Sequence, residues 1–195
     1  VEEAMKSRVL VITGGPGTGK TTLVRAIIAA AEQHDLKVHL MAPTGRAAKR
    51  LAVASHMDAD TIHKALEAEK REDGGTVFSR DESDPLEEDL IIVDEASMMD
   101  ISLFYHLLSA LKEDARLILV GDVDQLPPVG PGTPLKSIIA WEKVPVTRLK
   151  HIFRQKEGSG IIENAALIRE GNMCVPDEGG EFKILPVWSE EEAFD

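Results

Sequence analysis

A glycine-rich segment that ends in a lysine and a threonine sets narrow limits on how this chain can fold. Residues 14–21 read GGPGTGKT, which fits the pattern G-x-x-x-x-G-K-[ST] at every fixed position. A β-branched apolar run at 8–13 precedes the segment, and a helical pattern at 20–33 follows it. A strand, a tight loop and a helix in this order direct backbone N–H groups at phosphate oxygens. The segment therefore predicts a nucleotide site, and its context disfavours the alternative of a glycine-rich turn without a ligand.

Short aliphatic runs alternate with helical patterns along most of the chain. This alternation predicts an α/β fold, a mostly parallel sheet flanked by helices on both faces. Aromatic residues make up only 4% of the sequence, so we expect an aliphatic core. The expected strands span residues 8–13, 38–42, 90–93, 117–120 and about 144–149. The expected helices span about 20–33, 44–55, 61–70, 135–141 and 161–169, and a further helix opens at Asp100.

The alternation breaks between residues 71 and 89. Two glycines, Gly74 and Gly75, and several acids surround a short extended piece at 76–78. This composition predicts a small insertion, either a solvated loop or a hairpin. We therefore expect one domain over residues 1–172, with an insertion at about 71–89. An acidic tail or the start of a following domain would occupy 173–195.

Two acids directly follow the apolar strand at 90–93. Asp94 and Glu95 stand where that strand ends, and doubly wound sheets bind their ligands at this edge. Asp94 and Thr21 are candidate Mg²⁺ ligands, because hard cations take oxygen donors. Glu95 is a candidate to polarise the water that attacks a phosphate. The alternative is a strand end followed by acids that cap a helix. Gln125 follows the next strand, where its amide could contact both the γ-phosphate and the attacking water. The alternative is that Gln125 is an ordinary polar loop residue.

The overall charge argues against a nucleic-acid partner. The chain has 22 Lys and Arg against 34 Asp and Glu, a net charge of −12, whereas DNA binding relies on basic contacts to phosphate. However, Arg46, Lys49 and Arg50 form a local basic cluster just after Thr44, a predicted helix N-cap. Since steering depends on local potential, a phosphate contact at this helix start is compatible with an acidic chain. The alternative is a solvated helix face.

Six blocks taken in order carry a family resemblance. They are residues 14–22, APTGRAA at 42–48, TIH at 61–63, VDEASMM at 93–99, GDVDQLPPV at 121–129 and FRQ at 153–155. The series resembles the first RecA-like domain of superfamily 1 helicases, and most of all the RecD branch with the alpha subunit of exodeoxyribonuclease V. The resemblance implies a RecA-like P-loop NTPase fold. It also implies an ATP-dependent DNA helicase motor of recombination and repair, moving 5′ to 3′.

The resemblance also implies roles for single residues. Gln125 is similar to the family's coupling glutamine, and Arg154 to an arginine that reaches the γ-phosphate, so the expected catalytic side chains are Lys20, Glu95, Gln125 and Arg154. The expected contacts to ATP are Gly14, Gly15, Pro16, Gly17, Thr18, Gly19, Lys20, Thr21 and Thr22. The expected contacts to single-stranded DNA are Pro43, Thr44, Gly45, Arg46, Thr61 and His63.

Relatives in this family use a second RecA-like domain, and nothing after Gln155 resembles one. We therefore expect a part of a longer protein that alone binds nucleotide weakly and hydrolyses it slowly, with other exonuclease V subunits as further expected partners. The lone Cys174 and the lack of an apolar run of roughly 18 residues predict a cytoplasmic protein away from membranes. The alternatives are a P-loop ATPase of the clamp-loader or PhoH-like class, the helicase part of a conjugative relaxase, or a module in which nucleotide only fixes shape.

Overall fold

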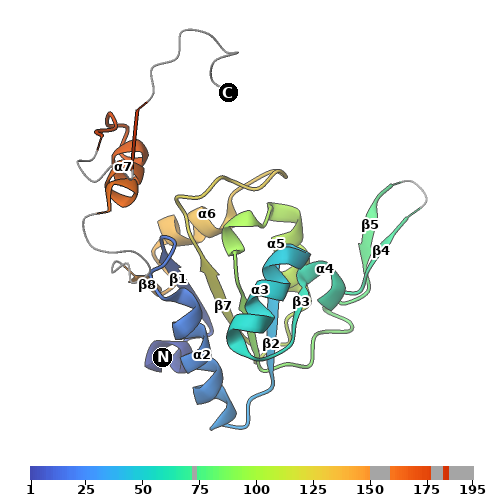
Figure 1. The fold of residues 1–195 in the computed structure, drawn as a ribbon. Coiled ribbons are helices and arrows are strands. Elements are labelled where there is room, and N and C mark those ends of the chain that lie inside the picture. The colour runs from blue at the N-terminus through green and yellow to red at the C-terminus, as the bar shows by residue number, and fades with distance from the viewer. Residues whose placement is uncertain (72–73, 150–158, 177–181, 185–195) are drawn as a thin grey trace. The chain divides into compact units, whose positions relative to one another are not determined.

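The computed structural model describes residues 1–71, 74–149, 159–176 and 182–184 (Figure 1). The chain divides into two compact units, Val1–Ile152 and Phe153–Asp195. In the second unit, helix α7 spans Gly160–Arg169. Its buried Asn164 donates amide hydrogen bonds to the carbonyls of Gly160 (2.8 Å) and Val175 (2.7 Å). The domain boundary that we expect at residue 172 stays a prediction.

Six parallel strands form the main sheet of the first unit, in the order β3-β2-β6-β7-β1-β8. Because β7 lies between β1 and β6, the carboxyl ends of these three strands meet at one edge of the sheet. The bounds are β1 Val9–Gly14, β2 Val38–Ala42, β3 Ala59–Thr61, β6 Leu90–Val93, β7 Arg116–Gly121 and β8 Val146–Leu149.

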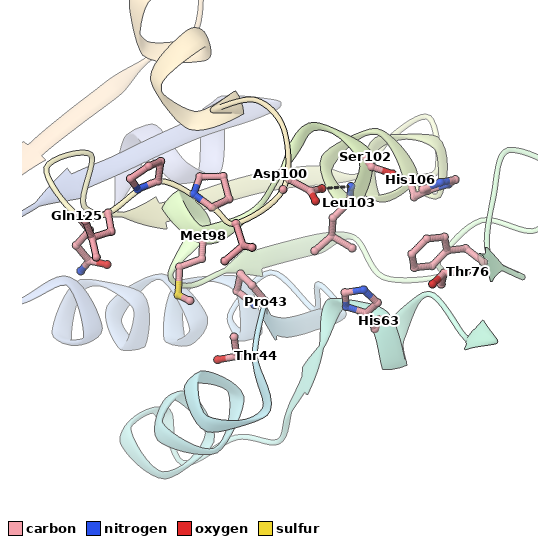
Figure 2. Close-up of a pocket in the computed structure, with 16 residues that line it drawn as sticks. Pro43, Thr44, His63, Thr76, Met98, Asp100, Ser102, Leu103, His106 and Gln125 are labelled. Atoms are coloured by element: carbon pink, nitrogen blue, oxygen red, sulfur yellow. Dashed lines mark hydrogen bonds between the residues drawn. The ribbon is translucent and has the colours of Figure 1, made fainter. Parts of the chain in front are cut away.

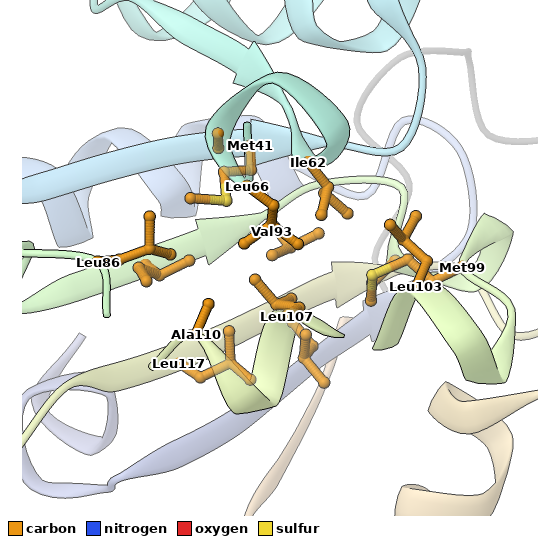
Figure 3. Close-up of a cluster of buried hydrophobic side chains, with 14 of the residues drawn as sticks. Met41, Ile62, Leu66, Leu86, Val93, Met99, Leu103, Leu107, Ala110 and Leu117 are labelled. Atoms are coloured by element: carbon orange, nitrogen blue, oxygen red, sulfur yellow. The ribbon is translucent and has the colours of Figure 1, made fainter. Parts of the chain in front are cut away.

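Helices cover both faces of this sheet, as the sequence predicts. Side chains alternate between the faces along each strand, so Ile12 packs with Ile27 of α2 on one face and Val11 belongs to the cluster of Leu107 of α5 on the other (Figure 3). All four residues of β6 are fully buried, which explains its unbroken apolar run. The helix bounds are α1 Glu2–Lys6, α2 Lys20–Glu32, α3 Gly45–Ser55, α4 Ile62–Ala65, α5 Ile101–Ser109 and α6 Pro134–Trp141.

Polar side chains fix the starts of three helices near the carboxyl edge of the sheet. Thr44 accepts from Ala47 N–H at 3.3 Å and caps α3, as predicted. Thr61 caps α4 by accepting from Lys64 N–H at 3.1 Å. Asp100 caps α5 in the same way, through Leu103 N–H at 2.8 Å. Each cap satisfies an otherwise unpaired backbone donor, so the loops that enter these helices are held in place.

The region around the predicted insertion differs from the expected pattern. The helix expected over 61–70 ends at Ala65, and Glu67 takes a left-handed backbone (φ 53°). The chain then forms β4, Ala68–Lys70, which pairs antiparallel with β5, Thr76–Phe78. A hairpin therefore exists, but it starts a few residues before the expected insertion (Figure 1). Strand pairing has overridden a local helical preference.

No helix among the described residues is long and apolar enough to cross a lipid bilayer.

Candidate functional site

The glycine-rich segment forms a tight loop, which we call the phosphate loop (residues 14–21). Gly17 and Gly19 adopt left-handed backbone angles, with φ of 77° and 87°, which side chains disfavour. A Cβ at Gly14 would lie 2.6 Å from Leu149 O and 2.8 Å from Thr18 Oγ1. The Thr18 hydroxyl donates to Gly15 O at 2.9 Å, inside the loop. Close packing therefore requires glycine at position 14, and backbone geometry favours it at 17 and 19.

Lys20 lies in this loop and is also the first residue of α2, and its side chain folds back over the loop. Its ammonium donates to the carbonyl oxygens of Gly14 (2.7 Å) and Gly15 (3.0 Å). Gly19 is the N-cap of α2, so the helix start faces the same space as the loop. A helix N-terminus and a cation together favour an anion at this position. The loop thus keeps the Lys20 ammonium beside the position that a bound phosphate would occupy.

Asp94 lies across from Lys20 at the end of β6. Burial raises the pKa of the Asp94 carboxyl above its ordinary value, and the Glu95 charge adds to this rise. The hydrogen bond from Glu95 N–H and the positive charges of Lys20 and Arg50 lower that pKa. The positive charge of Lys20 thus acts on the Asp94 carboxyl, and both residues follow strands at the carboxyl edge of the sheet.

The Asp94 side of the site has the donor chemistry that a magnesium ion requires. A half-buried carboxylate gains when a cation offsets its charge, and Thr21 can add a hydroxyl oxygen from the first turn of α2. No cluster of three His, Cys, Asp or Glu residues suited to a metal occurs in the described part of the chain. A metal here would therefore take its other ligands from phosphate and water, as Mg²⁺ commonly does.

Glu95 has an unusual backbone and an incompletely satisfied side chain. Its φ of 53° is left-handed, which is uncommon for a residue with a side chain. Its Oε1 lies 4.0 Å from the Arg50 guanidinium of α3. Its Oε2 is buried, with no hydrogen-bond partner among the described residues. The left-handed backbone places Glu95 as the N-cap of the short 3₁₀ turn Ala96–Met98.

The loop after β7 leads from the sheet edge to a neighbouring hollow. Asp122 is buried and accepts from Asp124 N–H at 3.0 Å, which fixes the start of the loop. Gln125 is exposed and lines a hollow of about 890 Å³ (Figure 2). Its lining residues are Pro43, Thr44, His63, Thr76, Phe78, Met98, Asp100, Ser102, Leu103, His106, Gln125, Leu126, Pro127, Pro128, Val129 and Gly130.

Three of the six expected DNA contacts line this hollow. Figure 2 shows Pro43, Thr44 and His63 between Gln125 at one end and Thr76 with His106 at the other. The expected contacts Gly45, Arg46 and Thr61 are not among the described lining residues. Gly45 and Arg46 form the exposed first turn of α3, and the Thr61 hydroxyl is engaged as the cap of α4.

A cluster of three rings, called here the ring stack although the rings are tilted by 34° and 40°, lines the hollow near Thr76 and was not expected from the sequence. The ring of Phe78, from the hairpin, lies 4.4 Å from that of His106 and 5.7 Å from that of His63, centroid to centroid. The three residues come from β5, α5 and α4. No spacing rule relates such distant segments, so no sequence signal could have grouped these rings.

Arg154, the last expected catalytic side chain, lies outside the described residues. Its role stays a prediction.

Comparison with known proteins identifies the family of this chain. Residues 1–131 match a family described as AAA domain. The chain is 42% identical over 158 residues to the ATP-dependent RecD2 DNA helicase of Deinococcus radiodurans, covering 81% of this chain and 21% of that protein. It is 39% identical over 161 residues to the RecBCD enzyme subunit RecD of Mycobacterium tuberculosis, covering 71% of this chain and 27% of that one. The chain thus spans about a fifth to a quarter of these relatives.

Solved structures agree with the fold. The Pif1 helicase of Candida albicans superposes with a TM-score of 0.64 at 27% identity, over 91% of this chain and 45% of that one. A Bacteroides Pif1 in complex with ADP-AlF4 gives a TM-score of 0.59 at 22% identity, over 89% of this chain and 46% of that one. Together with the parallel sheet, these likenesses confirm the predicted P-loop α/β fold.

Proposed function

This chain belongs to the AAA domain family, with the RecD-type helicases as its relatives, and from that premise we propose that it is the ATP-hydrolysing part of a DNA helicase motor. It would couple hydrolysis to movement along single-stranded DNA, 5′ to 3′ by family analogy, in recombination or repair. The observation that carries the proposal is one shared sheet edge. There the phosphate loop, the half-buried Asp94 and the Gln125 loop follow β1, β6 and β7, which lie side by side in the sheet.

The phosphate loop supports a nucleoside triphosphate as the ligand. Its backbone amides and the start of α2 would hold the phosphates, from Gly14 to Thr22. Lys20 would exchange its bonds to the carbonyls of Gly14 and Gly15 for the β- and γ-phosphate oxygens. This exchange keeps the ammonium solvated by oxygens throughout, so phosphate binding does not have to expose an unpaired buried cation.

The acids support hydrolysis and not only binding. Thr21 and Asp94 would hold Mg²⁺, which offsets charge on the phosphate oxygens when it is bound. Glu95 would accept a hydrogen bond from the attacking water and orient it in line with the γ-phosphate. Gln125 and Arg154 would contact the same phosphate group, as in the family that the motifs resemble. A clamp-loader or PhoH-like ATPase would share this chemistry but not the DNA response.

The hollow supports a single strand of DNA as the second ligand. Thr44 and the start of α3 offer a hydroxyl and backbone N–H groups, which suit a backbone phosphate. The ring stack of His63, Phe78 and His106 offers a surface for a base, since aromatic stacking tolerates any base. Gln125 lines this hollow and follows β7 at the nucleotide edge, so it would sense both ligands. A second RecA-like domain and other exonuclease V subunits belong to the same proposal as partners.

The direct test is ATP turnover by the intact protein with and without a single-stranded oligonucleotide. We expect the oligonucleotide to raise the rate severalfold in the wild-type protein. Glu95→Gln should keep ATP binding but lose turnover and unwinding, because the amide is a far weaker acceptor for the proton of water. A rate that does not respond to the oligonucleotide would instead favour a P-loop ATPase of another class. Unwinding that survives Glu95→Gln would favour a module in which nucleotide only fixes shape.

A further inference from the structure

Arg50 connects the predicted DNA-binding helix to the predicted hydrolytic acid. It lies on α3, the helix whose N-cap Thr44 lines the hollow. Its guanidinium Nη1 is 4.0 Å from Glu95 Oε1, and its positive charge also lowers the pKa of Asp94. One side chain of α3 thus acts electrically on both acids at the end of β6.

The Arg50–Glu95 ion pair is weak enough for Arg50 to exchange Glu95 for a DNA phosphate. The Arg50 side chain is 69% exposed, whereas the Glu95 side chain is only 19% exposed. An ion pair of this length with one solvated partner contributes little to stability. A DNA phosphate that approaches from solvent can therefore compete for the guanidinium, and no buried group has to be uncovered when the pair separates.

Arg50 stands where such a phosphate would arrive. Arg46, Lys49 and Arg50 are all exposed on α3, and residues three and four positions apart share one face of a helix. A phosphate held at this face by Arg46 lies within one helical turn of Arg50. The local positive charge of this face is present although the whole chain carries −12.

Loss of the Arg50 contact would favour a new orientation of the Glu95 carboxylate. Its Oε2 is buried with no hydrogen-bond partner among the described residues, and an unsatisfied buried oxygen is costly. Its left-handed backbone (φ 53°) places it at the start of the 3₁₀ turn Ala96–Met98. The carboxylate is therefore incompletely satisfied in this orientation, in which the Arg50 guanidinium is its ion-pair partner.

We propose that Arg50 is a positioning residue that keeps Glu95 turned toward α3 until single-stranded DNA binds. A backbone phosphate on α3 then draws the guanidinium away, and Glu95 turns to the water beside the γ-phosphate. Hydrolysis is slow without DNA because its base is held aside. This inference rests on the proposed function, since it requires both ATP hydrolysis and a DNA strand on α3.

The test compares Arg50→Ala, Arg50→Lys and Arg8→Ala in the intact protein, with turnover measured at saturating ATP with and without oligo-dT. Arg50→Ala should raise the DNA-free kcat about two- to fivefold, the shift available from a part-exposed ion pair. Stimulation by oligo-dT should fall toward one, with KM for ATP unchanged. Arg50→Lys should restore most of the stimulation. Arg8 is an exposed arginine before the opposite end of β1, paired with Asp114, so Arg8→Ala should behave as wild type.

The possible failures are distinguishable. If oligo-dT does not stimulate the wild-type protein, the proposed function fails and this inference falls with it. If the wild type is stimulated and Arg50→Ala keeps both of its rates, only the inference is wrong. A lower kcat in Arg50→Ala without DNA, at an unchanged melting temperature, would also overturn it, because Arg50 would then assist hydrolysis.

Discussion

The phosphate loop and the hollow lie at the same edge of one sheet, but they are built in different ways. The phosphate loop comes from eight consecutive residues and closes on itself through Lys20 and Thr18. The hollow is assembled from loops and elements between Pro43 and Gly130, and its ring stack joins three separate segments. A ligand with fixed triphosphate geometry suits the first, and a flexible strand with variable bases suits the second.

The difference also concerns what each region tolerates. In the phosphate loop, backbone atoms occupy the space beside Gly14, so even one added methyl group has no room. In the hollow, Leu126 and Val129 are 86% and 109% exposed, and their replacement disturbs little packing. We expect the phosphate loop to respond sharply to small changes and the hollow to respond gradually.

The first prediction, with the largest effect, tests whether ATP turnover at the phosphate loop is independent of DNA binding in the hollow. Lys20→Ala should lower ATP turnover by about 100- to 1000-fold, because it removes a preorganised charge that stabilises the transition state. Oligonucleotide binding in the absence of nucleotide, measured by fluorescence anisotropy, should remain near the wild-type value. Lys143→Ala, which removes another exposed lysine of the first unit, serves as the control. A parallel loss of DNA binding in Lys20→Ala would mean that the two regions are not separate.

The second prediction tests the tightness of the phosphate loop. Gly14→Ala should lower the free energy of unfolding by about 2 kcal/mol, because overpacking against rigid backbone costs about 1–3 kcal/mol. Gly15→Ala is the matched control, since a Cβ there meets nothing within 4 Å. Urea denaturation of the nucleotide-free protein measures both variants. Equal stabilities for the two would show that the backbone near Leu149 can move aside.

The third prediction tests the ring stack in the hollow. Phe78→Ala should weaken single-stranded DNA binding by about 1–2 kcal/mol, the contribution expected from one aromatic stacking platform. Val77→Ala, which shortens an exposed neighbour on the same strand, should leave the affinity for DNA unchanged. The Kd for ATP should be the same in both variants. An unchanged DNA affinity in Phe78→Ala would remove the stack from the binding surface.

The fourth prediction, with the smallest effect, concerns the half-buried Asp94. Since burial raises the pKa of Asp94, its ionised form destabilises the folded protein. Asp94→Asn should therefore raise the unfolding free energy at neutral pH by about 1 kcal/mol, while Mg²⁺-dependent nucleotide binding is lost. The advantage should disappear as the pH falls through the raised pKa to the ordinary value of 3.8, because the wild-type carboxyl is then neutral too. Thermal unfolding across this pH range provides the measurement.

The sequence was most informative where all determinants of a structure are neighbours. The phosphate loop, the caps Thr44, Thr61 and Asp100, and the apolar run of β6 are local patterns, and each takes the expected form. A cap needs one side chain and a backbone donor three residues away, so a short window contains its whole physical cause.

Structure that depends on distant partners was missed. β3 has only three residues and owes its conformation to pairing with β2. The helix expected to reach residue 70 stops because Ala68 pairs with Phe78. The stack of Phe78 with two histidines depends on that same pairing. Local preference differs by only a few tenths of a kcal/mol per residue, so a few cross-strand hydrogen bonds reverse it.

The position of β1 within the sheet has a consequence for how the protein is made. Both neighbours of β1, β7 and β8, are more than a hundred residues downstream, as in the pair Val9 and Leu117. At about 5–20 residues per second, a ribosome needs roughly 5 to 20 s to supply β7 after β1 has been synthesised. During that time an apolar strand has no partner, and a nascent chain of this kind is a natural client for holding chaperones. Chains stalled before residue 116 should therefore remain sensitive to protease, and resistance should appear only after β7 has left the exit tunnel.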